Sequence, residues 1–416
     1  MILSPSLGGV TLRLAILSRG PRLYSTRRLQ EEAIKRGIQT SILDPLQFTL
    51  SISKDSPQIL HKGDKVNFDA VLPRIGHSIT SHGVALLKQF EQLDIYTANA
   101  SQGIRQSRNK LLAAQILGRN NVPIPKTAYV RNINDVERAI HLVGGLPVVI
   151  KVSEGTQGRG VYLRHLYKDA IGLVSALLDL DHEVLIQEYI HESHGTDIRA
   201  LVVGDKVVAS MRRRARGREF RSNFHLNGTV EPVDLPPEYE EIALRAARVL
   251  GLNIAGVDLL EGENGPLVLE INSSPGLEGI EMASGINVAE KIIDFLEEDA
   301  QFVKVSMDQL LLTVPGHGIL PIHLVNHPWL VGEQIGEIFN DPETHAFALS
   351  RDRQLVWQPK NDLKLRYNDI LIFYGNLHQL RINLKNVLNY EEYNNMKNSS
   401  ELGKTGNAKN SEFNNI

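Results

Sequence analysis

The chain has 416 residues, 42% of them hydrophobic, and a net charge of −3 at pH 7, which suits two or three ordinary globular domains. It contains no cysteine, so disulfides, thiolate metal sites and a cysteine nucleophile are excluded. The N-terminus lacks the basic start of a signal peptide, and no run reaches the ~18 apolar residues of a membrane span. We therefore expect a cytoplasmic protein without membrane contacts.

Residues 13–104 alternate strand-like and helical segments. Four apolar runs predict strands at residues 13–18, 40–44, 69–76 and 95–99. Helical periodicity is found in two segments between them, 26–37 and 83–93. This order predicts a small α/β domain with a mainly parallel sheet. No GxGxxG motif follows the first strand, so a dinucleotide-binding fold of the usual type is not indicated.

Residues 105–300 mix strands, hairpins and helices, which is typical of an α+β domain. A helix is predicted over residues 107–120 and carries Lys110. Lys151 lies in the apolar strand LPVVIKV, where a lysine is costly unless it meets an anion or reaches water. The next segment, SEGTQGRG, has three glycines whose backbone amides could approach a phosphate. A strand lysine beside such a loop favours an anion site, although the loop alone could be a surface turn.

Two further strand segments carry polar side chains. EVLIQEYI contains Glu188 and Tyr189, and GTDIRALVVGDKVVASM predicts a hairpin that turns at residues 204–205. Asp197 and Arg199 share one face of its first strand, because side chains alternate with a period of two. Each of these residues could also be an ordinary polar residue of an edge strand.

Six arginines lie between Arg212 and Arg221, in the segment RRRARGREFRSN. Nucleic-acid binding is one interpretation, but the chain is acidic overall and shows no nucleic-acid-binding module, so we expect no direct nucleic-acid partner. A second interpretation is recognition of ATP phosphates and substrate carboxylates, which match the arginine fork. A solvated basic loop is the third.

Residues 257–276, VDLLEGENGPLVLEINSSPG, predict a β-hairpin that turns near Asn264. Asp258 then faces Glu270, and Asn272 lies on the same face as Glu270. Leu267, Leu269 and Ile271 alternate with the polar positions of the same strand, so we expect them to face the core. Opposed acids repel each other by roughly 0.2–1 kcal/mol, and an oxygen-only ligand set suits Mg²⁺. These three polar residues are therefore our candidate metal site, with two solvated acids as the alternative.

Together these features suit phosphoryl transfer, in which positioning and charge neutralisation supply most of the catalysis. The sequence has neither a Walker A motif nor the HRD and DFG motifs of kinases. It resembles the ATP-grasp carboxylate–amine ligases, most closely the RimK-type glutamate ligases that add glutamate to the C-terminus of a small-subunit ribosomal protein. The resemblance covers about residues 13–298 and is carried, in order, by AILSR, LDPL, DAVLPRIG, SEGTQGRG, IQEYI, DIRALVVGD, FRSN, AGVDLL and LEINSSPGLEGIE.

The resemblance implies a pre-ATP-grasp α/β domain over residues 13–104 and an ATP-grasp domain of two α+β lobes over residues 105–300. It matches Lys110 and Lys151 to phosphate-binding lysines and Asp197 to the ribose contact. Further matches are Glu188 and Tyr189 beside the adenine, Arg221, Ser222 and Asn223 beside the phosphates and metal, and Asp258, Glu270 and Asn272 as magnesium ligands.

The implied reaction forms an acyl phosphate from a substrate carboxylate and ATP, after which the amine of glutamate displaces phosphate. Mg²⁺ or Mn²⁺, as two ions per site, would offset the phosphate charge together with Lys151 and Arg221. Arg199 and Arg213 are candidates for substrate carboxylate contacts. The expected partners are ATP, glutamate, the acidic tail of a ribosomal protein and a second copy of the chain in a homo-oligomer. The alternatives are a ligase of a small peptide or amino acid and a non-catalytic nucleotide-sensing regulator.

Residues 308–385 alternate strand-like runs with turns and predict a small β-rich domain with one short helix near residues 332–339. The phrases VGEQIGEI, AFALSRD and YNDILIFYG resemble the C-terminal regulatory domains of potassium-uptake regulators, which implies a ligand-binding or dimerisation module. Residues 386–416 are rich in Asn, Lys and Ser with few apolar residues, which predicts a disordered tail.

Overall fold

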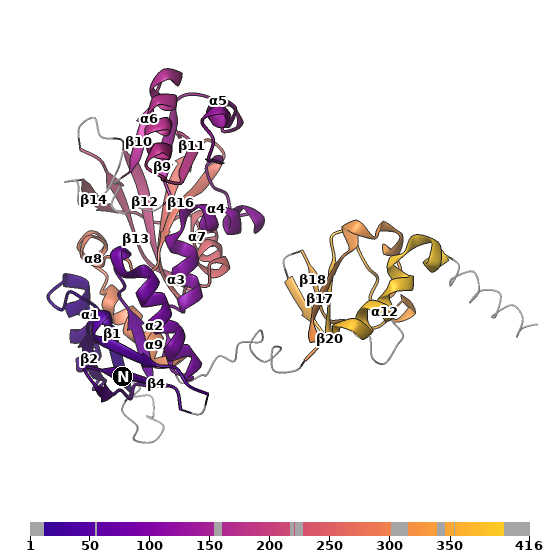
Figure 1. The fold of residues 1–416 in the computed structure, drawn as a ribbon, viewed down its shortest axis with the longest axis horizontal. Coiled ribbons are helices and arrows are strands. Elements are labelled where there is room, and N and C mark those ends of the chain that lie inside the picture. The colour runs from indigo at the N-terminus through magenta and orange to yellow at the C-terminus, as the bar shows by residue number, and fades with distance from the viewer. Residues whose placement is uncertain are drawn as a thin grey trace, which may run out of the picture. The chain divides into compact units, whose positions relative to one another are not determined.

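The computed structural model describes residues 12–54, 56–153, 160–216, 220, 228–300, 315–338, 346–352 and 354–394. The chain forms two compact units, Met1–Val303 and Lys304–Ile416 (Figure 1). No helix within the described ranges combines the length and the hydrophobicity needed to cross a bilayer.

The first unit begins with a four-stranded parallel sheet. Its strands, in the order β2-β1-β6-β7, are β1 (Arg13–Leu17), β2 (Gln39–Leu43), β6 (Ala70–Pro73) and β7 (Tyr96–Thr97). Helices α1 (Tyr24–Lys35) and α2 (Thr80–Gln92) connect these strands and bury apolar residues such as Leu29 and Phe90. The predicted α/β domain is confirmed. A small antiparallel sheet was not predicted, and it consists of β3 (Phe48–Ser51), β4 (Gln58–His61) and β5 (Asp64–Lys65).

Two antiparallel sheets follow, and they confirm the two expected α+β lobes. The first has the order β10-β9-β11-β8 and is built from β8 (Thr127–Val130), β9 (Val148–Val152), β10 (Val161–Arg164) and β11 (Val184–Glu188), with α5 (Val136–Leu142) and α6 (Tyr167–Asp179). The second has the order β14-β13-β12-β15-β16 and is built from β12 (Thr196–Val203), β13 (Lys206–Arg214), β14 (Thr229–Pro232), β15 (Ile254–Gly262) and β16 (Gly265–Asn272), with α7 (Pro237–Val249). The second sheet lies between the first and the parallel sheet (Figure 1).

The core of the parallel sheet is completed by helices from the far end of the first unit. Helices α8 (Glu278–Ser284) and α9 (Val288–Asp299) follow the β15–β16 hairpin. Leu296 of α9 belongs to the same buried cluster as Leu14 of β1 and Leu29 of α1. The chain therefore returns to its N-terminal sheet after the hairpin, which ties the two predicted domains together.

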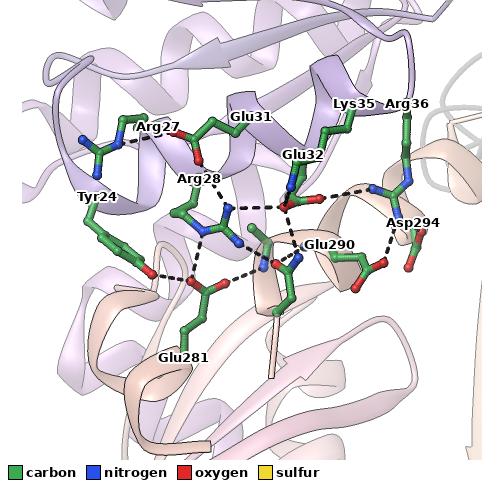
Figure 2. Close-up of polar contacts among 12 residues, drawn as sticks. Tyr24, Arg27, Arg28, Glu31, Glu32, Lys35, Arg36, Glu281, Glu290 and Asp294 are labelled. Atoms are coloured by element: carbon green, nitrogen blue, oxygen red, sulfur yellow. Dashed lines mark hydrogen bonds and ion pairs between the residues drawn. The ribbon is translucent and has the colours of Figure 1, made fainter. Parts of the chain in front are cut away.

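Polar contacts hold helix α1 against α8 and α9 (Figure 2). The Arg28 guanidinium lies 3.4 Å from a Glu281 oxygen and 3.2 Å from a Glu32 oxygen, and it donates to Asn287 Oδ1 at 2.9 Å. Tyr24 Oη donates to the same Glu281 carboxylate at 2.7 Å. One arginine thus contacts groups on α1, on α8 and at the N-cap of α9, which fixes the N-terminal sheet relative to the segment after the hairpin.

Asn99, just after β7, ties the parallel sheet directly to the hairpin. Its buried Nδ2 donates to the carbonyl oxygens of Ile254 and Ser273 at 2.7 and 2.9 Å. Its Oδ1 accepts the N–H groups of Asn253 and Ile254 at 2.8 and 2.7 Å. Because every donor and acceptor of this buried amide is used, the start of β15 and the end of β16 are held in place together.

The second unit contains an antiparallel sheet in the order β17-β20-β18-β19, which confirms the predicted β-rich domain. Its elements are β17 (His317–His323), α11 (Ile335–Ile338), β18 (Ala346–Arg351), β19 (Gln354–Trp357), β20 (Ile370–Asn376) and α12 (Leu377–Leu388). Leu380, Val387 and Tyr393 are buried in its core, so the expectation of disorder is wrong for residues 386–394. The remaining predicted tail, residues 395–416, lies outside the described residues.

Candidate active site

The predicted hairpin is formed by β15 and β16, and Asp258 pairs with Glu270 as expected from the turn position. Arg199 of β12 is the partner of Asp258 on its other side. A cation and two acids therefore form a row across three neighbouring strands. Asn272 lies beside this row, and its Nδ2 donates to Glu270 Oε1 at 3.2 Å.

A β-bulge changes which side chains of β16 face the core. The register shifts by one residue next to the two acids, which leaves Leu269 without a partner. Val268 and Ile271 are buried on either side of the bulge, whereas Leu267 and Leu269 are only half-buried. The prediction that Leu267 and Leu269 face the core is therefore wrong, because the extra residue reverses the alternation.

Asp258 is fully buried and bound by two arginines. Arg199 Nε and Nη2 donate to its two oxygens at 2.6 and 2.7 Å, and Arg213 Nη2 lies 2.8 Å from Oδ2. Arg213 Nε also donates to the buried Asp197 at 2.6 Å. Burial opposes ionisation of Asp258, but the charges of Arg199 and Arg213 hold its pKa below the usual range. The ribose role of Asp197 and the substrate contacts of both arginines stay predictions.

Glu270 has the opposite environment. Its side chain is exposed and makes no ion pair with any described residue, yet the protein around it removes part of its hydration. This desolvation, together with repulsion from Asp258, raises the pKa of Glu270. A divalent cation at the hairpin would relieve that repulsion and favour the ionised form.

The donor set fits a hard cation that is completed by ligands from outside the protein. No cluster of three or more His, Cys, Asp or Glu side chains suited to a metal occurs among the described residues. Two carboxylates and the Asn272 amide supply oxygens only, which suits Mg²⁺ coordinated in part by nucleotide phosphates. The metal role of the three residues stays a prediction.

The two predicted lysines lie together near Glu270. Lys151 of β9 is buried, and burial lowers its pKa to about 8, with Glu270 opposing this effect and Lys110 adding to it. Lys110 Nζ donates to the carbonyl oxygens of Val152 and Ser153 at 3.2 Å. These two hydrogen bonds place Lys110 beside the end of β9, next to Lys151, and Glu270 lies close enough to act on the charge of Lys151.

The helix predicted over residues 107–120 is divided into two. Helix α3 (Ser101–Arg108) ends before Asn109, and helix α4 (Lys110–Arg119) begins after it. Asn109 Oδ1 accepts the Leu112 N–H at 2.9 Å and so caps α4. The break places Lys110 on the first turn of α4.

Two arginines at this site were not predicted. Arg74 follows β6 and donates to the Pro275 carbonyl at 2.7 Å, and Arg108 ends α3 and donates to the Ile75 carbonyl at 2.7 Å. Burial lowers the pKa of both, that of Arg74 to about 10, and the charge of Glu270 opposes the shift at Arg108. The signal for Arg74 was its position at the carboxyl end of a parallel strand, where α/β sheets bind ligands.

Known families match both halves of the first unit. The profile described as RimK PreATP-grasp domain matches residues 12–104, and that described as RimK-like ATP-grasp domain matches residues 107–296. A protein of Rhodopirellula baltica named probable alpha-L-glutamate ligase is 44% identical over 372 residues, 89% of this chain and 92% of that protein. The chain belongs to the RimK-like ATP-grasp family.

Other RimK-like proteins match only part of the chain. An Aeromonas salmonicida protein, also named probable alpha-L-glutamate ligase, is 50% identical over 287 residues, 69% of this chain and 96% of that protein. The Rhodopirellula baltica alignment of 372 residues is longer than the first unit, Met1–Val303, so it includes residues of the second unit. The resemblance of that unit to potassium-uptake regulators stays a prediction.

Solved structures share the ATP-grasp fold. The RimK domain protein ATP-grasp from Sphaerobacter thermophilus has a TM-score of 0.53 at 23% identity and covers 68% of this chain and 99% of its own. The ATP-grasp ligase PsnB, complexed with minimal precursor, Mg and ADP, has a TM-score of 0.55 at 20% identity and covers 70% of this chain and 98% of its own. Membership of the RimK-like family confirms the expected enzyme class, an ATP-grasp carboxylate–amine ligase.

The remaining predicted residues of this RimK-like site are less completely described. Glu188 ends β11, and its Oε2 accepts the Lys126 N–H at 3.1 Å, while the hydroxyl of the next residue, Tyr189, contacts His194 Nδ1. Their adenine role stays a prediction. The other predicted site residues lie outside the described residues: Arg221, Ser222 and Asn223, with Gly155 and Gly158 of the glycine loop.

Three arginines of the predicted cluster are engaged with acids of the protein itself. Arg212 pairs with Glu261, Arg214 pairs with Glu231 at 2.7 Å, and Arg213 is bound within the Asp258 network. The interpretation of this segment as a solvated basic loop is therefore wrong for residues 212–214, which form the end of β13. Recognition of ligands by the rest of the cluster stays a prediction.

Proposed function

We propose that this ATP-grasp ligase joins the amine of glutamate to the C-terminal carboxylate of a small-subunit ribosomal protein, or of oligoglutamate, through an acyl phosphate. The observation that carries the proposal is the row of Asp258 and Glu270 on paired strands, with Lys151 within electrostatic range. The names of the Rhodopirellula baltica and Aeromonas salmonicida relatives support glutamate as the substrate.

The residues have the following proposed roles. ATP phosphates meet Lys110 and Lys151, together with Arg221, Ser222 and Asn223. The adenine lies beside Glu188 and Tyr189, and the ribose contacts Asp197. Asp258, Glu270 and Asn272 hold Mg²⁺ or Mn²⁺, as two ions, and the bound metal would neutralise charge on the phosphate oxygens.

In the proposed reaction a substrate carboxylate oxygen attacks the γ-phosphorus of ATP, and the bond from that phosphorus to ADP breaks. The amine of glutamate then attacks the acyl carbon, loses a proton and expels phosphate, which leaves a peptide bond. Lys151 and Arg221 face the negative charge of the transferred group. No enzyme nucleophile is needed, which agrees with a chain that has no cysteine.

ADP release tests the proposal. We expect Mg-ATP with glutamate and a peptide of the ribosomal protein's tail to release ADP, and the peptide mass to rise by whole glutamate residues. Release with glutamate and small peptides alone would favour a small-substrate ligase. Nucleotide binding with no release above background, with any of these acceptors, would contradict ligase activity and favour a nucleotide-sensing regulator. The homo-oligomeric state and the cytoplasmic location stay predictions.

ATP binding is expected to take up protons at about pH 8.5, because Lys151 is then partly neutral in the free protein and a polyphosphate beside it favours its charged form. Calorimetry in two buffers of different ionisation enthalpy measures this uptake. Lys151→Arg keeps a cation that cannot lose its proton in this range, so the variant should show less uptake than the wild type. Equal uptake by both proteins would contradict the placement of Lys151 beside the phosphates.

A further inference from the structure

Arg74 and Arg108 have hydrogen-bonding capacity that the described protein does not use. A guanidinium carries five N–H donors. Among the described residues Arg74 donates to the Pro275 carbonyl and Arg108 to the Ile75 carbonyl, and neither contacts a carboxylate. Arg108 Nε is buried and has no hydrogen-bond partner among the described residues. An unpaired donor of this kind costs free energy unless a ligand satisfies it.

The two arginines lie next to each other and next to the hairpin. Arg108 binds the carbonyl of Ile75, the residue after Arg74. Arg74 binds the carbonyl of Pro275, three residues beyond Asn272. Burial lowers the pKa of Arg74, and the positive charge of the neighbouring Arg108 lowers it further. Two neighbouring cations with little hydration attract an anion.

Other arginines of the chain show what a purely structural role looks like. Arg13 contacts Asp69 at 2.6 Å, and Arg351 contacts Asp369 at 2.6 Å, each with a bonded carboxylate. Glu270 is the acid that acts on Arg108, yet no hydrogen bond or ion pair joins them. If Glu270 holds a metal ion as proposed, its charge is taken up by the metal, and the arginines need another anion.

We propose that Arg74 and Arg108 together bind a carboxylate group of a ligation substrate beside the β15–β16 hairpin. The inference rests on the proposed function and adds a subsite to it. A carboxylate fits because its two oxygens accept parallel hydrogen bonds from a guanidinium fork. Two substrates carry such a group, the amine-donating amino acid and the acceptor tail.

Steady-state kinetics of Arg74→Gln and Arg108→Gln test the proposal. We expect the KM for one carboxylate substrate to rise about 10- to 100-fold, with the KM for ATP changed by less than about twofold. A rise in the KM for glutamate assigns the site to the donor, and a rise in the KM for the tail peptide assigns it to the acceptor. Replacing the bound carboxylate by an amide, in glutamine or isoglutamine for the donor, should abolish the difference between wild type and variant.

Arg105→Gln is the matched control, because Arg105 is an exposed arginine one turn earlier on α3. Arg108→Lys, which keeps the charge without the fork, should recover part of the affinity if the variant fold is intact by thermal melting. Suppose that the wild type is active but that the variants change no KM selectively, or change the KM values for ATP, glutamate and the tail peptide in parallel. That result overturns the proposed carboxylate site and leaves the proposed ligase function standing. A wild type that releases no ADP with glutamate and any acceptor overturns the proposed function, and the subsite with it.

Discussion

Glu270→Gln is expected to lower kcat by about 10³-fold while the melting temperature changes little. Glu270 is exposed and forms no ion pair with the described residues, so its neutral isostere removes little folding free energy. The amide is a weaker ligand for a hard cation, and it cannot neutralise the metal charge. ADP release at saturating ATP measures the loss, and thermal melting measures the stability.

The control for this variant is Glu263→Gln, because Glu263 is an exposed acid in the turn of the same hairpin. It should keep wild-type turnover. A higher Mg²⁺ concentration should restore part of the activity of Glu270→Gln if the variant has lost metal affinity. Wild-type turnover in Glu270→Gln at low Mg²⁺ would remove Glu270 from the metal site.

The pairing of Asp258 with Glu270 could be predicted from sequence because a tight turn fixes the register of the strands that it joins. The bulge at Leu269 could not. Leu267, Val268 and Leu269 are all apolar, so the hydrophobic pattern is the same whether or not one residue is extra. The regular alternation that we assumed therefore gave the wrong faces for Leu267 and Leu269.

The surroundings of the acids depend on contacts between distant parts of the chain. Arg199 and Asp258 become partners only because β12 lies beside β15 in the sheet. Arg74 and Arg108 reach the site from the N-terminal domain and from α3. Local periodicity predicts the strand or helix on which such a residue lies, but not the element packed against it. The sequence therefore predicted the hairpin acids, the lysines, Arg199 and Arg213 as candidate site residues, but not the contacts that join the arginines to the acids.

That network makes the two hairpin acids unequal. Asp258 is held ionised by Arg199 and Arg213, so it offers a fixed negative charge at every working pH. Glu270 has a raised pKa and no cation bonded to it among the described residues, so its charge depends on what occupies the site. A metal ion would bind to Asp258 only with further negative charge, since two guanidiniums already balance that carboxylate. Glu270 and the nucleotide phosphates are the groups that could supply it.

Asp258→Asn is accordingly expected to lose stability as well as activity, with an unfolding free energy lower by about 3–5 kcal/mol. The side chains of Asp258, Arg199 and Arg213 are 1%, 14% and 4% exposed. The variant would therefore leave two largely buried guanidinium groups with Asp197 as the remaining carboxylate of the network. Thermal and urea unfolding of the variant and wild type measure the difference.

Glu261→Gln provides the matched comparison, because Glu261 lies on the same strand and pairs with Arg212 at side-chain exposures of 34% and 21%. Its loss should cost less than about 1 kcal/mol, since water reaches this partly buried pair and Arg212 keeps Glu231 as a second acidic neighbour at 3.7 Å. Adding Arg199→Gln to Asp258→Asn should recover part of the stability, because it removes one of the uncompensated cations. Equal costs for Asp258→Asn and Glu261→Gln would show that the buried arginines do not depend on the charge of Asp258, which would contradict the ion pairs proposed to hold Asp258 ionised.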